Sequence, residues 1–408
     1  MRLICAVALA ALVVSGQSGM RDRYFARYPF DQWLSRPDRT QLKWSAHVRP
    51  AKLTAHQRMA SRIEIEIDEK EISARRGRGE LVTLVQIEDA AGKRWRIHNA
   101  FDLAPIPQDA KPHALLYSQE VFLVPGEYRV ALATCDSETH EYSFVRRTLH
   151  VGEVHGDALA HSGQDLPAVE FVRQLDMPDS WFQPYIRGRL HVGMETKRAV
   201  HVDLVMNLTP SERASGSLRV FRRNMSVLVP SLKLLAAMEV PNGTLDVTLL
   251  DLTRQKTWEQ KSARGLDWMK MREPLANNLP AVIDVESLAA RQRMAQFFRD
   301  QVVGRAMAVA GRDELRVVIV LSAPAFLDHQ FRLEPASFER DPNRKVFYLR
   351  YRPFFARTNP DGTVSISGMP ADDLEHALKP LDARVLTAST PEDFRKAVAS
   401  MLADIRKM

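Results

Sequence analysis

One apolar run constrains the fold more than any other stretch: His201-Val-Asp-Leu-Val-Met-Asn-Leu208, which ends in Thr209-Pro210-Ser211. A short apolar run bounded by turn-forming residues is typical of a strand buried on both faces of a sheet. A second run, Arg316-Val-Val-Ile-Val-Leu-Ser322, ends in the same way at Ala323-Pro324. Because both faces of such strands need a cover of helices, the two runs predict an α/β domain.

From about residue 198 onward, apolar runs alternate with segments of helical periodicity. This alternation predicts crossover connections and a parallel, Rossmann-like sheet with helices. The predicted strands are 201–208, 245–252, 316–322, 346–351 and 384–388. The predicted helices are 229–239, beginning near Pro230, then 285–307 and 391–407.

The last of these helices has the clearest start signal. Thr390 can cap it, with Pro391 in the first turn and Asp393 three residues after the cap. Its predicted buried stripe consists of Phe394, Val398, Met401, Leu402 and Ile405.

An earlier part of the chain, residues 50–152, has the period of half-buried strands. Ile63, Ile65 and Ile67 alternate with acidic residues. Predicted strands at 81–88 and 94–98 flank a hairpin turn, strands at 121–124 and 127–134 flank Pro125-Gly126, and 142–151 is a further strand. Short strands separated by turns predict an antiparallel β-sandwich of immunoglobulin-like type over 50–152. We expect an extended lead-in at about 20–60 and a linker at 153–197.

The first eighteen residues are typical of a secretory signal. Arg2 is followed by an apolar run from Leu3 to Val14 and by small residues at 15–18. The run is too short to span a bilayer comfortably, although an uncleaved anchor is the alternative. No later segment is long and apolar enough for a membrane span. We therefore expect an exported protein, in the periplasm, at the cell surface or secreted.

Charge argues against nucleic acid as the partner. The net charge is +7, but the basic residues are scattered and are not interleaved with aromatic residues. After removal of the signal, Cys135 is the only cysteine left, so no intrachain disulfide is possible.

The order of elements over residues 198–408 resembles a von Willebrand factor A domain. The segment Leu381-Asp-Ala-Arg-Val-Leu-Thr-Ala-Ser-Thr-Pro-Glu-Asp-Phe394 is similar to that family's last strand and the start of its last helix. The run Val317–Ser322 and the first strand occur in the matching order. The resemblance implies a divalent cation at the carboxyl edge of the sheet, held by Asp-x-Ser-x-Ser after the first strand and by an Asp after the later strand.

This chain departs from that metal motif at both acidic positions. Asn207, Thr209 and Ser211 fall on the first motif, and Ala323 stands at the position of the later Asp. A hard dication gains most from ionised carboxylates, so we predict no metal and no cofactor. We predict instead that Asn207, Thr209, Ser211 and Asp328 contact a partner. A strand-end turn, with these side chains bonded to local backbone, is the competing interpretation.

The sequence therefore favours an exported, non-enzymatic module that binds a protein partner without a metal. One alternative is a metal-dependent adhesion module in which Asp328 supplies the missing carboxylate. Another is a hydrolase that uses Asp328 and His329, although no nucleophile motif accompanies them.

Overall fold

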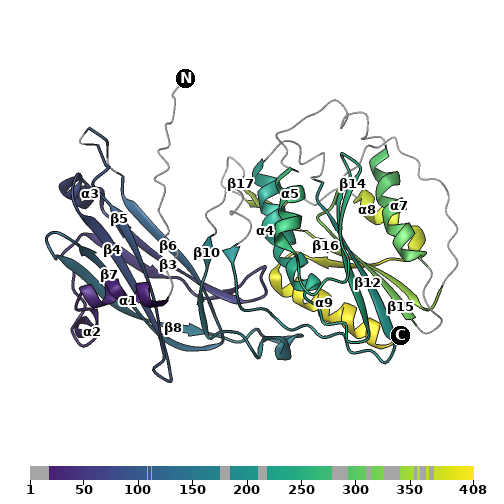
Figure 1. The fold of residues 1–408 in the computed structure, drawn as a ribbon, viewed down its shortest axis with the longest axis horizontal. Coiled ribbons are helices and arrows are strands. Elements are labelled where there is room, and N and C mark those ends of the chain that lie inside the picture. The colour runs from purple at the N-terminus through teal and green to yellow at the C-terminus, as the bar shows by residue number, and fades with distance from the viewer. Residues whose placement is uncertain are drawn as a thin grey trace.

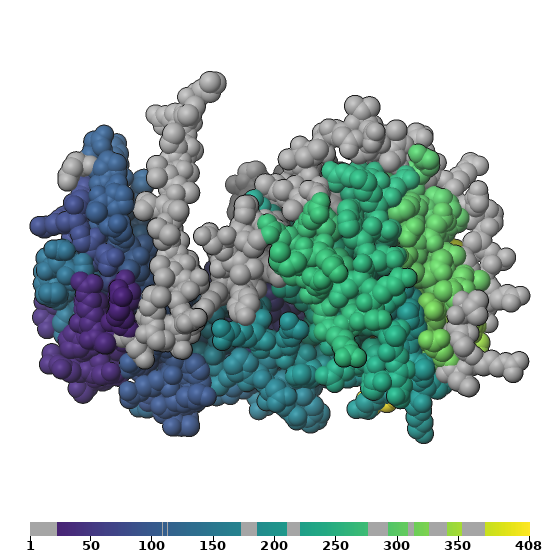
Figure 2. All heavy atoms as spheres, viewed as in Figure 1, coloured from purple at the N-terminus to yellow at the C-terminus, as the bar shows by residue number. Residues whose placement is uncertain are grey.

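The chain is described here from a computed structural model. The structure describes residues 18–107, 109–111, 113–174, 184–209, 218–277, 293–308, 314–325, 341–352, 356–358, 364–366 and 372–408. Figure 1 shows an N-terminal part made mainly of antiparallel strands and a C-terminal part in which helices cover a sheet. In Figure 2 the two parts are joined by teal residues at the bottom of the view.

The C-terminal part is built on one six-stranded sheet. Its strand order is β14 (Lys256–Gln260), β13 (Gly243–Asp251), β12 (Ala199–Asn207), β15 (Glu314–Ser322), β16 (Arg344–Tyr351) and β19 (Arg384–Ala388). All neighbours are parallel except β13 and β14, which are antiparallel. Taken in chain order, this is the 3-2-1-4-5-6 arrangement of a doubly wound sheet, and the order reverses between β12 and β15. The predicted parallel sheet is confirmed, while the antiparallel edge strand β14 was not predicted.

Helices cover both faces of this sheet. On one face, α4 (Leu218–Ala236) and α9 (Pro391–Arg406) pack on Val202, Leu204 and Met206 of β12. On the other face, α7 (Met294–Ala306) and α8 (Asp373–Leu378) pack around Val205. Burial on both faces explains why the run 201–208 has apolar residues on both faces, Val202, Leu204 and Met206 on one and Val205 on the other.

The helix boundaries follow their capping residues. In α9, the Asp393 N–H donates to Thr390 Oγ1 at 3.1 Å and the Thr390 N–H donates to Asp393 Oδ2 at 3.1 Å, which forms the predicted cap. Phe394 is buried with the rest of the predicted stripe, except that Leu402 is only half-buried. The helix predicted at 229–239 is wrong in its start: α4 begins at Leu218 and contains Pro230 in its interior.

The N-terminal part contains two antiparallel sheets. One has the order β5 (Arg94–Asp102), β4 (Glu80–Asp89), β7 (Gly126–Asp136) and β8 (Tyr142–Val151). The other has the order β1 (Trp44–Val48), β3 (Met59–Ile67), β6 (Leu115–Leu123) and β9 (Val169–Phe171), with β2 (Lys52–Leu53) beside β3. Residues of both sheets, including Ile63, Ile65, Val85 and Val130, share one buried core. Strand β9 lies within the segment predicted as a linker.

The strand-turn-strand unit predicted around Pro125-Gly126 is not a hairpin. Strand β6, before the turn, pairs with β3, whereas β7, after it, pairs with β4 in the other sheet. Val121 and Val130 nevertheless point into the same core. Alternation identifies a half-buried strand but does not distinguish a neighbour in the same sheet from one in the facing sheet, so the pattern alone was misleading.

The predicted extended lead-in is also wrong in its first half. Residues there form α1 (Ser18–Arg27) and α2 (Phe30–Trp33). Phe25, Phe30 and Trp33 pack on Val82 and the other residues of the outer face of the four-stranded sheet. These aromatic side chains give β4 a second buried face, which accounts for its almost unbroken burial.

The remaining elements are short: α3 (Glu69–Arg75), η1 (Ala160–Gly163), β10 (Arg173–Gln174), β11 (Pro184–Tyr185), α5 (Trp268–Asn277), β17 (Ala356–Thr358), β18 (Val364–Ile366) and η5 (Lys379–Leu381). Within the part of the chain that the structure describes, none of the helices combines the length and apolarity needed to cross a membrane.

A hydrogen-bonded junction connects the two parts. Arg395 of α9 is buried, and its guanidinium donates to Gln57 O at 2.7 Å and to Gln57 Oε1 at 3.2 Å. The same guanidinium pairs with Asp157, and Gln57 Nε2 donates to the Pro391 carbonyl at 3.0 Å. Gln57 holds a left-handed backbone with φ of 59°. The loop 54–58 of the N-terminal part is thus fixed against the first turn of α9.

Candidate functional site

The carboxyl edge of the six-stranded sheet, where β12, β13, β15 and β16 end, is a candidate binding site. Open α/β sheets bind ligands outside the carboxyl ends of their strands, at the point where the strand order reverses. Here that point lies between β12 and β15. Asn207 and Ser322 are the last residues of these two strands.

Asn207 is enclosed by hydrogen bonds within the protein. Asn207 is only 2% exposed to solvent. The amide Nδ2 donates to Ser322 Oγ at 3.1 Å and, more weakly, to Thr209 O at 3.4 Å. The amide Oδ1 accepts from the Thr209 N–H at 2.9 Å. Both polar atoms of the carboxamide are therefore occupied.

Thr209 connects this group of hydrogen bonds to the neighbouring strand, β13. Its Oγ1 accepts from the Leu252 N–H at 2.6 Å, which ties the end of β12 to the end of β13. The bonds of Asn207 and Thr209 are those expected for a strand-end turn. Ser211, Asp328 and His329 lie outside the described residues, so contact of this residue set with a partner stays a prediction.

Two buried acids at this edge were not foreseen from the sequence. Asp251 at the end of β13 accepts from the Arg254 N–H at 3.0 Å and from Arg254 Nη1 at 2.9 Å. Asp372 caps α8, and its Oδ1 accepts from the N–H groups of Ala325 at 3.1 Å and Leu374 at 3.2 Å. Their only sequence signals are an Arg three residues on and a position just before a short helix, which indicate a turn and a cap.

Asp372 also has a buried hydroxyl partner. Tyr348 on β16 donates its phenolic O–H to Asp372 Oδ2 at 2.7 Å, and Arg350 lies 3.8 Å away. Burial raises the pKa of Asp372 above its ordinary value, and the Tyr348 hydrogen bond only partly opposes this effect. The described carboxylates of this edge thus already serve protein donors, and a cation would have to displace those donors before it could bind.

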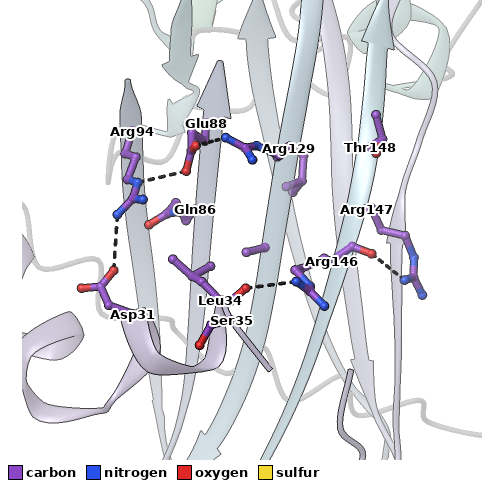
Figure 3. Close-up of a pocket in the computed structure, with 12 residues that line it drawn as sticks. Asp31, Leu34, Ser35, Gln86, Glu88, Arg94, Arg129, Arg146, Arg147 and Thr148 are labelled. Carbon is purple, nitrogen blue, oxygen red and sulfur yellow. Dashed lines mark hydrogen bonds and ion pairs between the residues drawn. The ribbon is translucent and has the colours of Figure 1, made fainter. Parts of the chain in front are cut away.

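A pocket of about 560 Å³ lies on the outer face of the four-stranded sheet, beside α2. Figure 3 shows Arg94 between Asp31 and Glu88, with Arg129 reaching the other side of Glu88. The Arg129 side chain is 74% exposed. Exposed ion pairs contribute little free energy. The lining has two acids, Asp31 and Glu88, and four arginines, so its net charge is about +2.

Comparisons with known proteins give little support for any one family. No family model and no curated protein matches this sequence. Among solved structures, the conserved hypothetical protein BatB from Bacteroides thetaiotaomicron is 12% identical; the match covers 51% of this chain and 100% of that chain, with a TM-score of 0.27. An aerotolerance-related membrane protein from Bacteroides fragilis is 13% identical over 50% of this chain and 99% of that chain, with a TM-score of 0.28. At such TM-scores these likenesses support no argument about fold or function.

Proposed function

We propose that this chain is an exported, non-enzymatic protein-interaction module. In this proposal residues 198–408 form a von Willebrand factor A-like domain that contacts a protein partner at the carboxyl edge of the sheet without a metal there. The strand order and the capped last helix support the domain assignment. An immunoglobulin-like sandwich over residues 50–152 would support this domain, and the signal-like residues 1–18 motivate the expectation of export.

The observation that carries the proposal is the set of hydrogen bonds made by the Asn207 carboxamide. A carboxylate at this strand end would offer a cation two anionic oxygens. The carboxamide offers one neutral oxygen, and that oxygen already accepts the Thr209 N–H. Its other end donates to Ser322, so the positive end of the amide dipole faces the carboxyl end of β15. Such an edge favours direct contact with a partner over recruitment of an ion.

Site-specific crosslinking tests both halves of the proposal. A photo-crosslinker is attached to the purified mature chain at Thr387, an exposed residue near the carboxyl end of β19. The matched control carries the same label at Glu66, an exposed residue on β3 of the N-terminal part. Each protein is incubated with the native envelope or medium fraction, once with Mg²⁺ and Ca²⁺ and once with EDTA.

The proposal predicts one protein adduct from the Thr387 label, of equal yield with the metals and with EDTA, and none from the Glu66 label. An adduct that needs Mg²⁺ or Ca²⁺ would instead favour the metal-dependent alternative. Equal adducts from both labels would contradict a binding surface at the carboxyl edge.

A further inference from the structure

A second pocket, of about 510 Å³, lies at the opposite, amino edge of the six-stranded sheet. It is bounded by the first residues of β12, β13 and β15 and by the C-terminal end of α7. The side chains that matter for its chemistry are His201, Asp203, Asp246, Thr248, Arg305 and Arg316. None of them belongs to the carboxyl edge described above.

The sheet itself brings the pocket's ionisable groups together. His201 and Asp203 are two residues apart on β12, so both side chains point to the face covered by α7. Parallel pairing places Asp246 of β13 opposite Asp203, and Arg316 of β15 opposite His201. An imidazole and two carboxylates thus converge from two neighbouring strands, which hold them rigidly.

The spacing of these groups fits a single small ion. His201 Nε2 lies 3.5 Å from Asp203 Oδ2 and 3.8 Å from Asp246 Oδ2. One ligand atom from each residue lies within 4.8 Å of the others. Two ligands bound tetrahedrally to one Zn²⁺ at its usual bond lengths are about 3.4 Å apart, close to the first two separations.

The orientation of His201 is a second observation in favour of an ion. Its Nδ1 is hydrogen-bonded to the Thr244 hydroxyl, on the strand that also carries Asp246. This bond turns Nε2 toward the two carboxylates. Histidines that bind metals almost always donate their other ring N–H to a neighbouring acceptor, which orients the ring, and the Thr244 hydroxyl can accept such a bond.

Arg316 is the obvious competitor for the same charge. Its Nη1 donates to Asp203 Oδ2 at 3.0 Å, while its Nε is buried and has no hydrogen-bond partner. The pocket is lined by four carboxylates, of Asp203, Asp246, Glu259 and Asp300, and by three cations, Lys261, Arg305 and Arg316. Without counting His201, the lining therefore carries a net charge of about −1.

We propose that His201, Asp203 and Asp246 bind one divalent transition-metal ion, and that Zn²⁺ suits this set of ligands best. One imidazole nitrogen and two carboxylate oxygens are ligands that Zn²⁺ commonly takes, and they leave its fourth position open to the pocket. Mg²⁺ and Ca²⁺ prefer oxygen ligands alone and are disfavoured by the histidine. The proposal concerns the amino edge and is independent of partner binding at the carboxyl edge.

Calorimetric titration of the full, tag-free chain with Zn²⁺, after treatment with EDTA, tests the site. We expect one equivalent of Zn²⁺ to bind with a Kd in the micromolar range or below. His201→Gln and Asp246→Asn each remove a proposed ligand, so they should weaken binding by more than the roughly 10- to 100-fold that loss of an outer-shell partner costs, or abolish it. His191→Gln is the matched control, because His191 also lies near two acids, Asp165 and Glu239, but its side chain is 54% exposed.

Arg316→Gln separates a metal site from a purely structural ion-pair network. If an ion binds beside Asp203, removal of the competing guanidinium should tighten Zn²⁺ binding several-fold. Circular dichroism in EDTA checks that each variant is folded, and the visible spectrum of the Co²⁺-loaded protein reports the coordination geometry. The proposal is overturned if the wild-type chain binds no Zn²⁺ at a hundred-fold excess. It is equally overturned if His201→Gln and Asp246→Asn leave binding unchanged, or if His191→Gln alone removes it.

Discussion

Replacing Asn207 by Asp introduces an acid at the end of β12, as in von Willebrand factor A domains, and we expect the change to destabilise the protein. The side chain is 2% exposed, and its Nδ2 donates to Ser322 Oγ at 3.1 Å. The carboxylate loses this donor and places a second oxygen near Thr209 O, to which Nδ2 now donates at 3.4 Å.

The magnitude follows from these contacts. A lost buried hydrogen bond costs about 1 kcal/mol, and leaving a buried group badly paired costs about 1–3 kcal/mol more. We therefore expect the free energy of unfolding of the α/β part to fall by about 2–4 kcal/mol at neutral pH. For a domain of this size, that corresponds to a decrease in Tm of roughly 5–15 °C.

The loss should depend on pH in a defined direction. Burial raises the pKa of the introduced carboxyl in the folded state above its value in the unfolded chain. The unfolded chain then releases the proton first, so the stability of the variant falls as pH rises from the unfolded pKa to the folded pKa. The difference between variant and wild type should therefore be smallest near pH 4 and largest at pH 7.

Urea unfolding at both pH values, with and without millimolar Mg²⁺, measures this effect. Asn242→Asp is the matched control, since it makes the same chemical change on an exposed turn before β13. We expect no restoration of Asn207→Asp by Mg²⁺, because Asp251 and Asp372 already serve protein donors. A variant as stable as wild type, or one that Mg²⁺ stabilises, would refute the argument that hydrogen bonds within the protein already occupy the Asn207 side chain.

Three further predictions follow from other contacts. Arg395→Met should split thermal unfolding into two transitions and expose residues 152–172 to limited proteolysis, because it removes the bonds to Gln57 and Asp157; Lys396→Met, at the exposed neighbouring position, should not. Burial lowers the pKa of His56 from 6.5 to about 4, so stability should decrease as pH falls from 6.5 toward 4, and His56→Gln should flatten that part of the curve measured by urea unfolding at each pH. Thr390→Ala should lower the free energy of unfolding by about 1 kcal/mol by removing the α9 cap, whereas Thr390→Ser should preserve it; chemical denaturation that ranks Ser below Ala would contradict this role.

Sequence patterns identified the parallel sheet because its strands are buried on both faces. Only a strand covered on both sides needs runs such as 201–208 and 316–322, so these strands were predicted close to their observed bounds. Strand β14 was missed because Lys256–Gln260 is half exposed and largely polar. The two helices over the four-stranded sheet were missed because their aromatic residues have no sustained period.

The sites were less predictable than the fold, since they depend on pairing between distant segments. Asn207 and Thr209 were identified from their place after a strand. The contact of Asn207 with Ser322 and the cap of α8 by Asp372 require the strand order and the crossover paths. His201 and Asp203 belong to the run 201–208, whose pattern indicates only a buried strand. Only the parallel register with β13 reveals that Asp246 joins them.

The hydrogen bonds between Arg395 and Gln57 make the position of the 54–58 loop and that of α9 depend on each other. A ligand that reshapes the 54–58 loop has to break or strengthen the Arg395 contacts, and it therefore changes the free energy of the first turn of α9. The dependence holds in both directions, because displacing the first turn of α9 breaks the same hydrogen bonds that fix the loop. Each part of the molecule therefore helps to stabilise the segment of the other that it contacts.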